Sequence, residues 1–514
     1  MNKKLSWIIL ISAAVLGAAL WVLFALPRYT SIHHSISQSK AVHKAQDFLK
    51  TAYGVDTKPY YVSCIFTADE QADRYLQKTI GFEQENKFLQ KQGHDLFFWI
   101  VRFFKEQNKE EFRVVVSSQT GQVIGLSHEI DDSAVRPVMD EAEARVQAFA
   151  FLTKNFGFNP ADYTIHNQQS RKFDHRQDHA FVWEKNNIAI AWSKDPQAPG
   201  AKLVSNVVIS GGDILSFSKN SLEIPDAFNR YVENLKETGK NLTLVFRLLY
   251  LALLTMSIMF VVNRKQNLVL RVVRPFYWRA AVVLLVVLIL GAFNDLYITL
   301  FAYPTTQSLK SYLVRELIES LINPLFIVLA FILPCLAGED VCYEVNAQHP
   351  KSALLSNILS TFWSKGTAKN ILAGYFTGII VLGLQAVMFE FGYRYCGVWQ
   401  ELTWMTQSST AIIPALVALL IGMQASFAEE GMFRLFGINM GLKYFKNTTA
   451  AVLVSAIIWG FGHTGYEIFP MWFRGLEVTA LGIVLGVVYL RFGLIATITA
   501  HFLMDVILAS LPIY

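Results

Sequence analysis

Three full charges stand within residues 427–434, in a stretch that otherwise reads as a membrane-spanning helix (FAEEGMFR). An ionisable side chain at bilayer depth costs roughly 2.5–3.5 kcal/mol, so such residues usually pair, line a cavity or do chemistry. Glu430 and Arg434 are four residues apart, with the acid N-terminal to the base, which favours an ion pair within the helix. Glu429 points about 100° away around that helix and has no such local partner. An unpaired carboxylate in a membrane is a candidate for acid–base chemistry.

Two later spans also carry polar side chains. The span after Glu429 ends with Trp459 and His463, and the last span holds His501 and Asp505 one helical turn apart. Taken singly, each has a structural explanation, as a histidine at a helix end or as polar glue between helices. Taken together with a carboxylate, two histidines supply the groups that bind and deprotonate a water molecule or hold a metal. Hydrolysis is therefore the leading reaction class.

The helices must bring these groups to one depth. Glu429 lies about 13 Å from the inner end of an expected span at 410–438, at 1.5 Å per residue. His463 lies about 22 Å from the start of an expected span at 448–464. The difference of about 9 Å requires a tilt or a later start of the second helix. Without that, the polar groups do not converge.

The ordered motifs Glu-Glu-x-x-x-Arg, aromatic-x-x-x-His and His-x-x-x-Asp resemble the signature of the CPBP family. This family comprises CAAX prenyl proteases and bacteriocin-processing or immunity proteins, also called Abi proteins, which are intramembrane proteases. The resemblance covers roughly residues 370–512. It implies an intramembrane endopeptidase that cuts a peptide bond near the membrane face.

Carried over to this chain, the resemblance implies that Glu429 activates water with the help of His463. His501 and Asp505 would face the scissile carbonyl and stabilise the oxyanion. Asp505 stands where the family has Asn or Asp, and because an ionised Asp donates no hydrogen bond, we expect it to orient His501. The supporting residues implied are Glu430 and Arg434, which brace the helix, and Trp459, where the family usually has Phe.

The sequence leaves the cofactor open. Family members are often described as metalloproteases, and Glu429, His463 and His501 are the candidate ligands for a divalent metal such as zinc. A metal-free mechanism, in which Glu429 and His463 hold the water, is equally compatible with these residues. No His-Glu-x-x-His motif, which would make zinc the default, occurs in the chain.

Composition places the chain in a membrane. Its 514 residues are 53% hydrophobic, too apolar for a wholly soluble protein. An apolar run at 5–26 after Lys3 and Lys4 predicts an uncleaved signal anchor whose basic end stays in the cytoplasm. The small net charge of +5 gives no case for a nucleic-acid partner. Further spans are expected at 241–263, 280–302, 319–337, 369–390, 410–438, 448–464, 475–490 and 494–512.

Residues 28–240 are polar and predict a soluble extracytoplasmic α+β domain. Two helical patterns in it end alike, at Gly54 and at Gly157, and a strand-Gly-strand hairpin follows each. An aromatic strand also recurs, around Trp99 and around Trp183. The sequence thus predicts an internal duplication whose order resembles that of the PepSY domain.

The predicted architecture is an α-helical polytopic bundle of about eight helices plus the signal anchor, with the soluble domain inserted after the anchor. We expect a plasma (inner) membrane protein with four parts: an anchor at 1–27, the extracytoplasmic domain at 28–240, additional transmembrane helices and cytoplasmic loops at 241–368, and the catalytic core at 369–514. The expected partners are a peptide or membrane-protein substrate and lipid, with the soluble domain a candidate to bind a substrate or regulator. A non-catalytic scaffold and a proton-coupled transporter are the alternatives.

Overall fold

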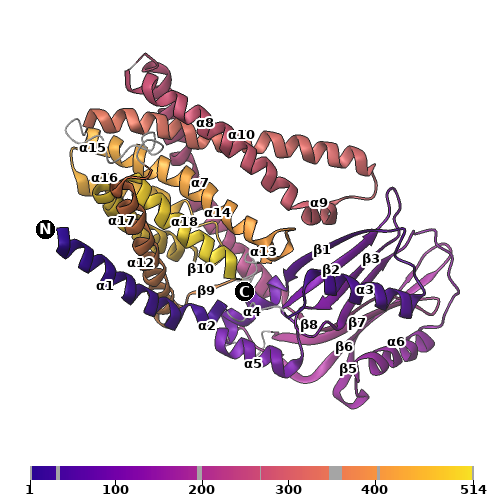
Figure 1. Ribbon diagram of the computed structural model, residues 1–514. Helices are drawn as coiled ribbons and strands as arrows, with labels where there is room; N and C mark the ends of the chain where they lie inside the picture. The colour runs from indigo at the N-terminus through magenta and orange to yellow at the C-terminus, as the bar shows by residue number, and fades with distance from the viewer. Residues whose placement is uncertain are drawn as a thin grey trace.

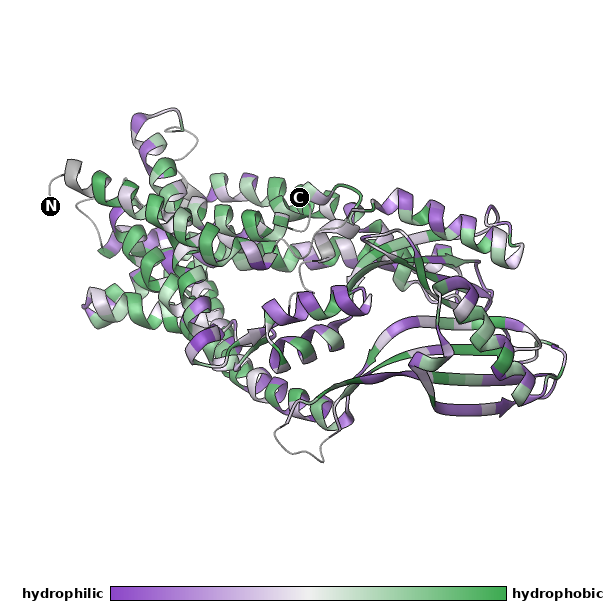
Figure 2. Cartoon of the chain, turned by 90° about the horizontal axis from the view of Figure 1, so that it is seen from below, coloured by the Kyte–Doolittle hydropathy of each residue, from purple (hydrophilic) through white to green (hydrophobic). Residues whose placement is uncertain are grey.

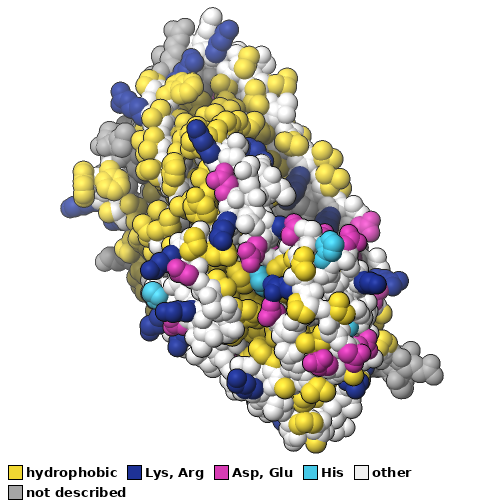
Figure 3. Space-filling view, turned by 90° about the vertical axis from the view of Figure 1, so that its right-hand side faces the viewer, with side chains coloured by type: hydrophobic (Ala, Val, Ile, Leu, Met, Phe, Trp, Pro, Cys, Tyr) yellow, Lys and Arg dark blue, Asp and Glu magenta, His cyan; other side chains and the backbone are white. Residues whose placement is uncertain are grey.

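The computed structural model describes residues 3–29, 35–193, 199–266, 268–345, 362–401 and 406–511. It has two parts, a helical bundle and an eight-stranded antiparallel sheet with its own helices (Figure 1). The helices of the bundle are mostly hydrophobic, whereas hydrophilic residues are frequent in the sheet part (Figure 2). Charged side chains are scattered over the face of the molecule shown in Figure 3, with hydrophobic side chains dominating the upper part of the view. This division agrees with the predicted membrane bundle and soluble domain.

Seven helical segments among the described residues are long and apolar enough to cross a membrane. One of them follows the N-terminus, and six belong to the later bundle. Two more apolar helices of the bundle are shorter, α16 (Thr448–Phe461) and α18 (Leu494–Ser510). The polytopic bundle is thus confirmed. The long helices are α1 (Lys3–Phe24) with α2 (Leu26–Tyr29), α7 (Asp226–Asn263), α8 (Leu268–Asn294), α10 (Leu309–Val345), α12 (Lys365–Tyr395), α14 (Pro414–Glu429) with its continuation, and α17 (Met471–Phe492).

The helix that carries the charged stretch runs further than its apolar pattern predicts. Asn439, which ends the apolar run, is buried and donates hydrogen bonds of 2.6 Å to the Leu435 carbonyl and the Tyr489 hydroxyl. A satisfied amide is tolerated inside a bundle, so the helix continues beyond residue 438. It follows α14 as the π-helical segment η6 (Glu430–Ile438) and then as α15 (Asn439–Phe445).

Small residues bring α18 close to α12. A Cβ added to Gly374 would lie 2.6 Å from the Ala496 carbonyl oxygen, and one added to Gly378 would lie 2.9 Å from that of Ala500. Only glycine permits such an approach of two backbones. The pair of glycines therefore fixes the position of the helix that carries His501.

The soluble part is one sheet with the strand order β1-β2-β3-β4-β8-β7-β6-β5. Each half is an antiparallel meander, and the halves join where β4 pairs with β8. The predicted strand-Gly-strand hairpins are β3–β4 and β7–β8. The strands are β1 (Tyr61–Ala68), β2 (Phe97–Phe104), β3 (Glu111–Ser117), β4 (Val123–Glu129), β5 (Tyr163–Lys172), β6 (Gln177–Ile190), β7 (Ala201–Ser210) and β8 (Asp213–Glu223).

Each half of the sheet begins with an amphipathic helix. Ser37 caps α3 (Gln38–Tyr53) and Asp140 caps α6 (Glu141–Phe156), each through its side chain. Both helices end at a left-handed glycine, Gly54 with φ 66° and Gly157 with φ 68°, as the sequence predicts. The order of one helix and four strands therefore occurs twice. The first half also holds α4 (Glu70–Thr79) and α5 (Phe82–Gln92), and the second the short 3₁₀ helix η2 (Pro160–Asp162).

The predicted aromatic strand recurs as the second strand of each half, with Trp99 in β2 and Trp183 in β6, but the two tryptophans do not hold equivalent positions along it. Trp99 donates its indole N–H to the carbonyl of Ile36, just before α3. The equivalent contact before α6, to the carbonyl of Met139, is made by His179 and not by Trp183. His179 thus fills the place beside the helix start that Trp99 fills in the first half. One shared tryptophan was too short a pattern to align the two strands residue by residue.

The first half of the sheet lies against the bundle. Its edge strand β1 contacts α9 (Leu296–Ala302) and α13 (Gln407–Thr410), two short helices of the membrane part.

The span expected at 280–302 consists of two helices, α8 and α9, with the break at Asp295. A two-stranded ladder, β9 (Trp399–Gln400) with β10 (Ile468–Phe469), lies beside α4. The predicted domain boundary at residue 240 falls inside the continuous helix α7.

Candidate active site

Glu429 and His463 meet although they lie on different helices. Glu429 is the last residue of α14, and His463 follows the end of α16 at Phe461. The Glu429 Oε2 and His463 Nε2 atoms are 3.8 Å apart. The predicted depth mismatch disappears because α15 adds seven residues on the inner side of Glu429. The two groups lie too far apart for a strong direct hydrogen bond, and the gap suits a small molecule that contacts both.

Trp459 holds both members of this pair. Its indole Nε1 donates a hydrogen bond to Glu429 Oε2. Its carbonyl oxygen lies 2.7 Å from His463 Nδ1. Because a carbonyl only accepts, Nδ1 carries a proton, and neutral His463 presents an unprotonated Nε2 toward Glu429. The pair therefore offers two hydrogen-bond acceptors to the space between them.

His501 lies between two carboxylates. Its Nδ1 is 2.8 Å from Glu430 Oε1, and its Nε2 is 3.4 Å from Asp505 Oδ2. Glu430 Oε1 is also 3.0 Å from Arg434 Nη1, so the predicted intrahelical ion pair is present. Glu430 is fully buried and Arg434 is 1% exposed. A buried carboxylate with two cationic neighbours braces α18 against the helix that carries Glu429.

One aromatic ring organises the whole group. The guanidinium of Arg434 lies 4.0 Å from the centroid of the Trp459 ring. The imidazole centroids of His463 and His501 lie 5.4 and 5.5 Å from it, both edge-on. A larger ring than Phe thus touches both histidines and keeps an N–H for Glu429. All seven residues singled out from the sequence come together around Trp459.

The widened turn of η6 begins between the two acidic neighbours. π-Helical turns are rare and often mark functional positions. Glu430, the first residue of η6, faces the protein interior, whereas Glu429 lines two cavities. Adjacent residues thus meet different surroundings.

The first cavity, of about 600 Å³, extends from this group toward the soluble domain. Glu429, His463, His501 and Asp505 line it, together with Glu70 and Arg74 of α4 at its mouth. A second cavity, of about 480 Å³, lies between α7, α10, α14 and α16 and shares Glu429 and His463 with the first. The candidate active site is therefore accessible from two sides.

Three polar residues at the first cavity were missed in the sequence: Gln385 and Arg474 line it, and Glu477 is buried behind them. Arg474 Nη1 lies 2.5 Å from Glu477 Oε2, and Gln385 Nε2 donates to Glu477 Oε1 at 3.1 Å. Glu477 is fully buried, and Arg474 Nε has no hydrogen-bond partner among the described residues. A charged pair three residues apart at the start of an apolar span was the signal that could have found them.

A second carboxylate pair at the mouth was also missed. Arg74 Nε lies 2.5 Å from Glu401 Oε2 and 2.9 Å from Glu467 Oε2. Burial, with the adjacent Glu467 carboxyl group, raises the pKa of Glu401 to about 9, against the opposing charge of Arg74. Burial alone would raise the pKa of Glu467, but hydrogen bonds from Glu401 and Lys236 lower it. The two carboxyl groups therefore hold one proton between them near neutral pH.

The predicted metal ligands do not form a metal-binding set in this arrangement. Both ring nitrogens of His501 face carboxylates, and Nδ1 of His463 is bonded to a carbonyl, which leaves Glu429 and one imidazole nitrogen as free donors. A catalytic zinc site takes three protein ligands. Among the described residues, no group of three or more His, Cys, Asp or Glu has a geometry that fits a metal ion.

Comparison with known proteins points to one family. Residues 411–507, which include all seven predicted site residues, match the model of the type II CAAX prenyl endopeptidase Rce1-like family. The chain is similar to the sporulation-killing factor biosynthesis protein SkfC of Bacillus subtilis (strain 168), with 28% identity over 151 residues. That similarity covers 28% of this chain and 29% of SkfC. No solved structure matches the chain. The C-terminal part of the bundle thus carries a region similar to the Rce1-like domain of type II CAAX prenyl endopeptidases.

Proposed function

We propose that this protein is an intramembrane endopeptidase in which Glu429 and His463 activate a water molecule. The observation that carries the proposal is the gap between Glu429 Oε2 and unprotonated His463 Nε2, lined by Trp459 and open to a cavity. A water molecule in this gap donates one hydrogen bond to each acceptor. Its oxygen lone pair then points into the cavity, where a peptide carbonyl can be reached.

In the proposed reaction, Glu429 takes a proton from the water while the oxygen attacks the carbonyl carbon. The carbonyl oxygen becomes an oxyanion. When the tetrahedral intermediate collapses, the C–N bond breaks and the amine nitrogen takes the proton back from Glu429. One water is consumed, and an acid and an amine leave. A positioned acid–base group of this kind contributes roughly 10²–10⁴-fold to the rate.

His501 is the proposed donor to the oxyanion. Since both of its ring nitrogens face carboxylate oxygens, both carry protons. The Nδ1 contact with Glu430 is short, but the 3.4 Å from Nε2 to Asp505 exceeds an ordinary hydrogen bond. The Nε2 proton is therefore available to a carbonyl oxygen in the cavity. Asp505 orients the imidazole, as the sequence suggests.

The substrate is proposed to be a peptide or a membrane-protein segment, which reaches Glu429 through either cavity. The second cavity, between α7 and α14, provides a route from the side of the bundle. The first provides a route from the soluble domain. A prenylated C-terminal peptide is one substrate class that the family name suggests.

The first test uses the purified full chain in detergent with a peptide library. We expect the wild type to cleave, and Glu429→Gln, His463→Ala and His501→Ala to lose about 10²-fold or more. Glu319→Gln, an exposed glutamate of α10, is the matched control and keeps wild-type activity. No cleavage by the wild type, or equal cleavage by Glu429→Gln, would falsify the proposal. Binding without cleavage would favour the scaffold alternative.

A chelator separates the metal-free reaction from a metal-dependent one. The donor set described above predicts that prolonged dialysis against a chelator leaves cleavage unchanged. Loss of activity that only added zinc restores would show that the site rearranges to hold a metal.

We propose further that the protein lies in the plasma (inner) membrane with residues 28–240 outside. Helix α7 runs from the soluble domain to Asn263, so the basic turn with Arg264 and Lys265 lies at its other end. Basic loops stay in the cytoplasm. In intact cells, a membrane-impermeant maleimide should label Val135→Cys, which is 77% exposed, and spare Lys265→Cys, which is exposed in this turn. The opposite labelling would reverse the orientation.

A further inference from the structure

A charged cluster joins the soluble domain to the mouth of the candidate active site. Arg74 comes from α4, Glu401 follows β9, Glu467 precedes β10, and Lys236 comes from α7. Arg74 contacts both glutamates, and Lys236 Nζ lies 2.6 Å from Glu467 Oε1. The side chains of Arg74, Glu401 and Lys236 are 13%, 8% and 12% exposed. The cluster is therefore largely shielded from solvent, where ion pairs are more sensitive to the loss of a partner.

The cluster is directly connected to His463. Glu467 is four residues after His463, in the segment 462–470 that links α16 to α17. The backbone of His463 lies beyond the end of α16, and one hydrogen bond, from Nδ1 to the Trp459 carbonyl, ties its ring to that helix. Its ring stacks on Tyr466 at 5.8 Å between centroids. The position of the imidazole thus depends on how this segment is held.

Segment 462–470 is held on three sides. The Thr464 hydroxyl lies 2.9 Å from the Thr243 hydroxyl of α7, and Gly465 lies against Thr243. The β9–β10 pairing holds its C-terminal end. On the remaining side, Arg74 is the described contact through which the soluble domain reaches Glu467. On this side Lys236 of α7 also contacts Glu467, and Phe469 packs into the hydrophobic core of the soluble domain, so Arg74 is the charged restraint that the domain places on the segment.

We propose that Arg74 is a positioning residue, through which docking of the soluble domain holds segment 462–470 so that His463 faces Glu429. The inference rests on the proposed function and extends it, since hydrolysis in the membrane then depends on a residue of the soluble domain. Arg74 lines the mouth of the cavity and acts through Glu467 and Glu401. Any ligand or partner that displaces α4 would weaken this restraint and lower the rate.

The proposal predicts a separation of kinetic constants. Without Arg74, the buried Glu401 and the partly exposed Glu467 lose their common cation, and segment 462–470 loses one restraint. A misplaced His463 slows the chemical step, whereas the cavity that binds the peptide stays in place. We expect kcat to fall about tenfold with KM changed less than about twofold. Arg74→Lys keeps the charge but not the fork that contacts two glutamates, so it should restore only part of the rate.

The test uses the full chain in proteoliposomes and the peptide that the wild type cleaves best in the library. Arg74→Met, Arg74→Lys and Glu467→Gln are compared with the matched control Arg230→Met, whose exposed ion pair with Asp226 lies on α7. Thermal unfolding of each variant reports folding. If Arg74→Met does not fold, Glu467→Gln carries the test, because it weakens the same contact from the bundle side.

A selective fall in kcat for Arg74→Met and Glu467→Gln, with Arg74→Lys intermediate and Arg230→Met unchanged, supports the proposal. Unchanged kcat in Arg74→Met and Glu467→Gln overturns it, as does a rise in KM alone. These results would leave the proposed function standing, since the wild type still cleaves. If the wild type cleaves nothing, the proposed function fails first and the role of Arg74 fails with it.

Discussion

The two halves of the soluble sheet share one order of elements but have opposite surroundings. The outer edge of β1 lies against the bundle, through α9 and α13. The outer edge of β5 pairs with no strand, and most of its residues are exposed. Both halves share the plan of one helix and four strands, so this plan does not explain why only the first half docks against the bundle. That docking depends on a few side chains and on backbone groups at the β1 edge.

The docked half makes hydrogen bonds across the junction. Arg102 of β2 donates to the carbonyls of Phe301 at 2.8 Å and Tyr303 at 2.7 Å, at the C-terminal end of α9. Thr410 Oγ1 accepts from the Phe66 amide of β1 at 2.9 Å. A sheet edge whose amides are paired by another part of the chain is protected from wrong partners.

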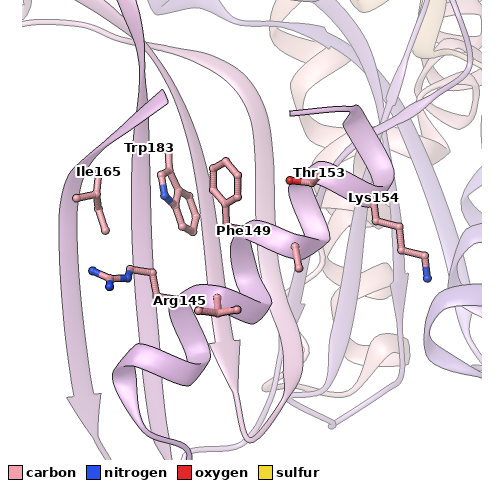
Figure 4. A pocket seen from close by; sticks show the side chains of 8 residues that line it. Arg145, Phe149, Thr153, Lys154, Ile165 and Trp183 are labelled. Carbon is pink, nitrogen blue, oxygen red and sulfur yellow. The ribbon is translucent and has the colours of Figure 1, made fainter. Parts of the chain in front are cut away.

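The free half leaves an open groove between α6 and the sheet (Figure 4). Its volume is about 670 Å³, and Phe149, Ile165 and Trp183 form its apolar lining, with Arg145 and Lys154 at its sides. Val146, on the same helix, is 68% exposed. Helix α6 thus leaves part of its apolar surface exposed beside this groove.

The largest effect should come from breaking the docked edge at Arg102. This residue also pairs with Glu111, and both are buried. Arg102→Met removes the buried cation beside Glu111, which keeps only the half-exposed Arg113 as a partner, and should cost up to about 3–5 kcal/mol of unfolding free energy. Denaturant unfolding measures the loss, with Arg171→Met on β5 as the control. A change below 1 kcal/mol would show that docking does not depend on this residue.

The second-largest effect should come from raising the pH, which weakens the contact between the soluble domain and the bundle at Glu401. The pKa of Glu401 is raised from its ordinary value of 4.5 to about 9, so its contribution to docking is complete below about 4.5, declines as the pH rises and is lost above about 9. One titrating group changes the unfolding free energy by at most about 1.4 kcal/mol per pH unit. Cleavage by the wild type, divided by cleavage by Glu401→Gln, should fall between pH 7 and 9.5. A constant ratio would contradict this, because other titrations are common to both proteins.

A smaller loss should follow from removing one edge hydrogen bond. Thr410→Val leaves the buried Phe66 amide without its acceptor, which costs about 1–2 kcal/mol. Thermal unfolding measures this cost. Thr164→Val on β5 is the matched control, because the exposed Thr164 hydroxyl donates to Asn186 at the surface. If both variants lowered the unfolding temperature equally, the β1 edge and the β5 edge would not differ in their dependence on such a hydrogen bond.

The smallest effect is expected at the free groove. Val146→Ser and Ile165→Thr should change the unfolding free energy by no more than about 0.5 kcal/mol and leave cleavage unchanged, because these side chains are exposed. Purified protein in detergent suits both measurements. A loss of cleavage would mean that the free half is coupled to the membrane site, and the contrast between the halves would need revision.

Short-range patterns predicted much of the candidate site. One-turn spacing was enough for the Glu430–Arg434 ion pair, and three ordered motifs were enough to single out Glu429, His463 and His501. Their convergence could not be read from span lengths, because the helix continues through the buried, satisfied Asn439 and passes through a π-helical turn.

Contacts distant in sequence stayed hidden. His501 meets Glu430 across 71 residues, and Arg74 meets Glu467 across 393. No local spacing encodes such pairs, which arise only when helices and domains pack. Arg474 and Glu477 could have been found from the sequence, since an ion pair at the start of an apolar span is unusual. The docking of β1 was not, because an edge strand has the same alternation whether it is covered or free.

Helix α7 links the two parts of the protein without a linker. It is 38 residues long, about 57 Å, and it carries both Lys236 and Thr243, which contact the segment that bears His463. A rod of this kind transmits force, whereas a flexible linker would absorb it. A tilt of the soluble domain would therefore be passed along α7 to segment 462–470 and so to His463.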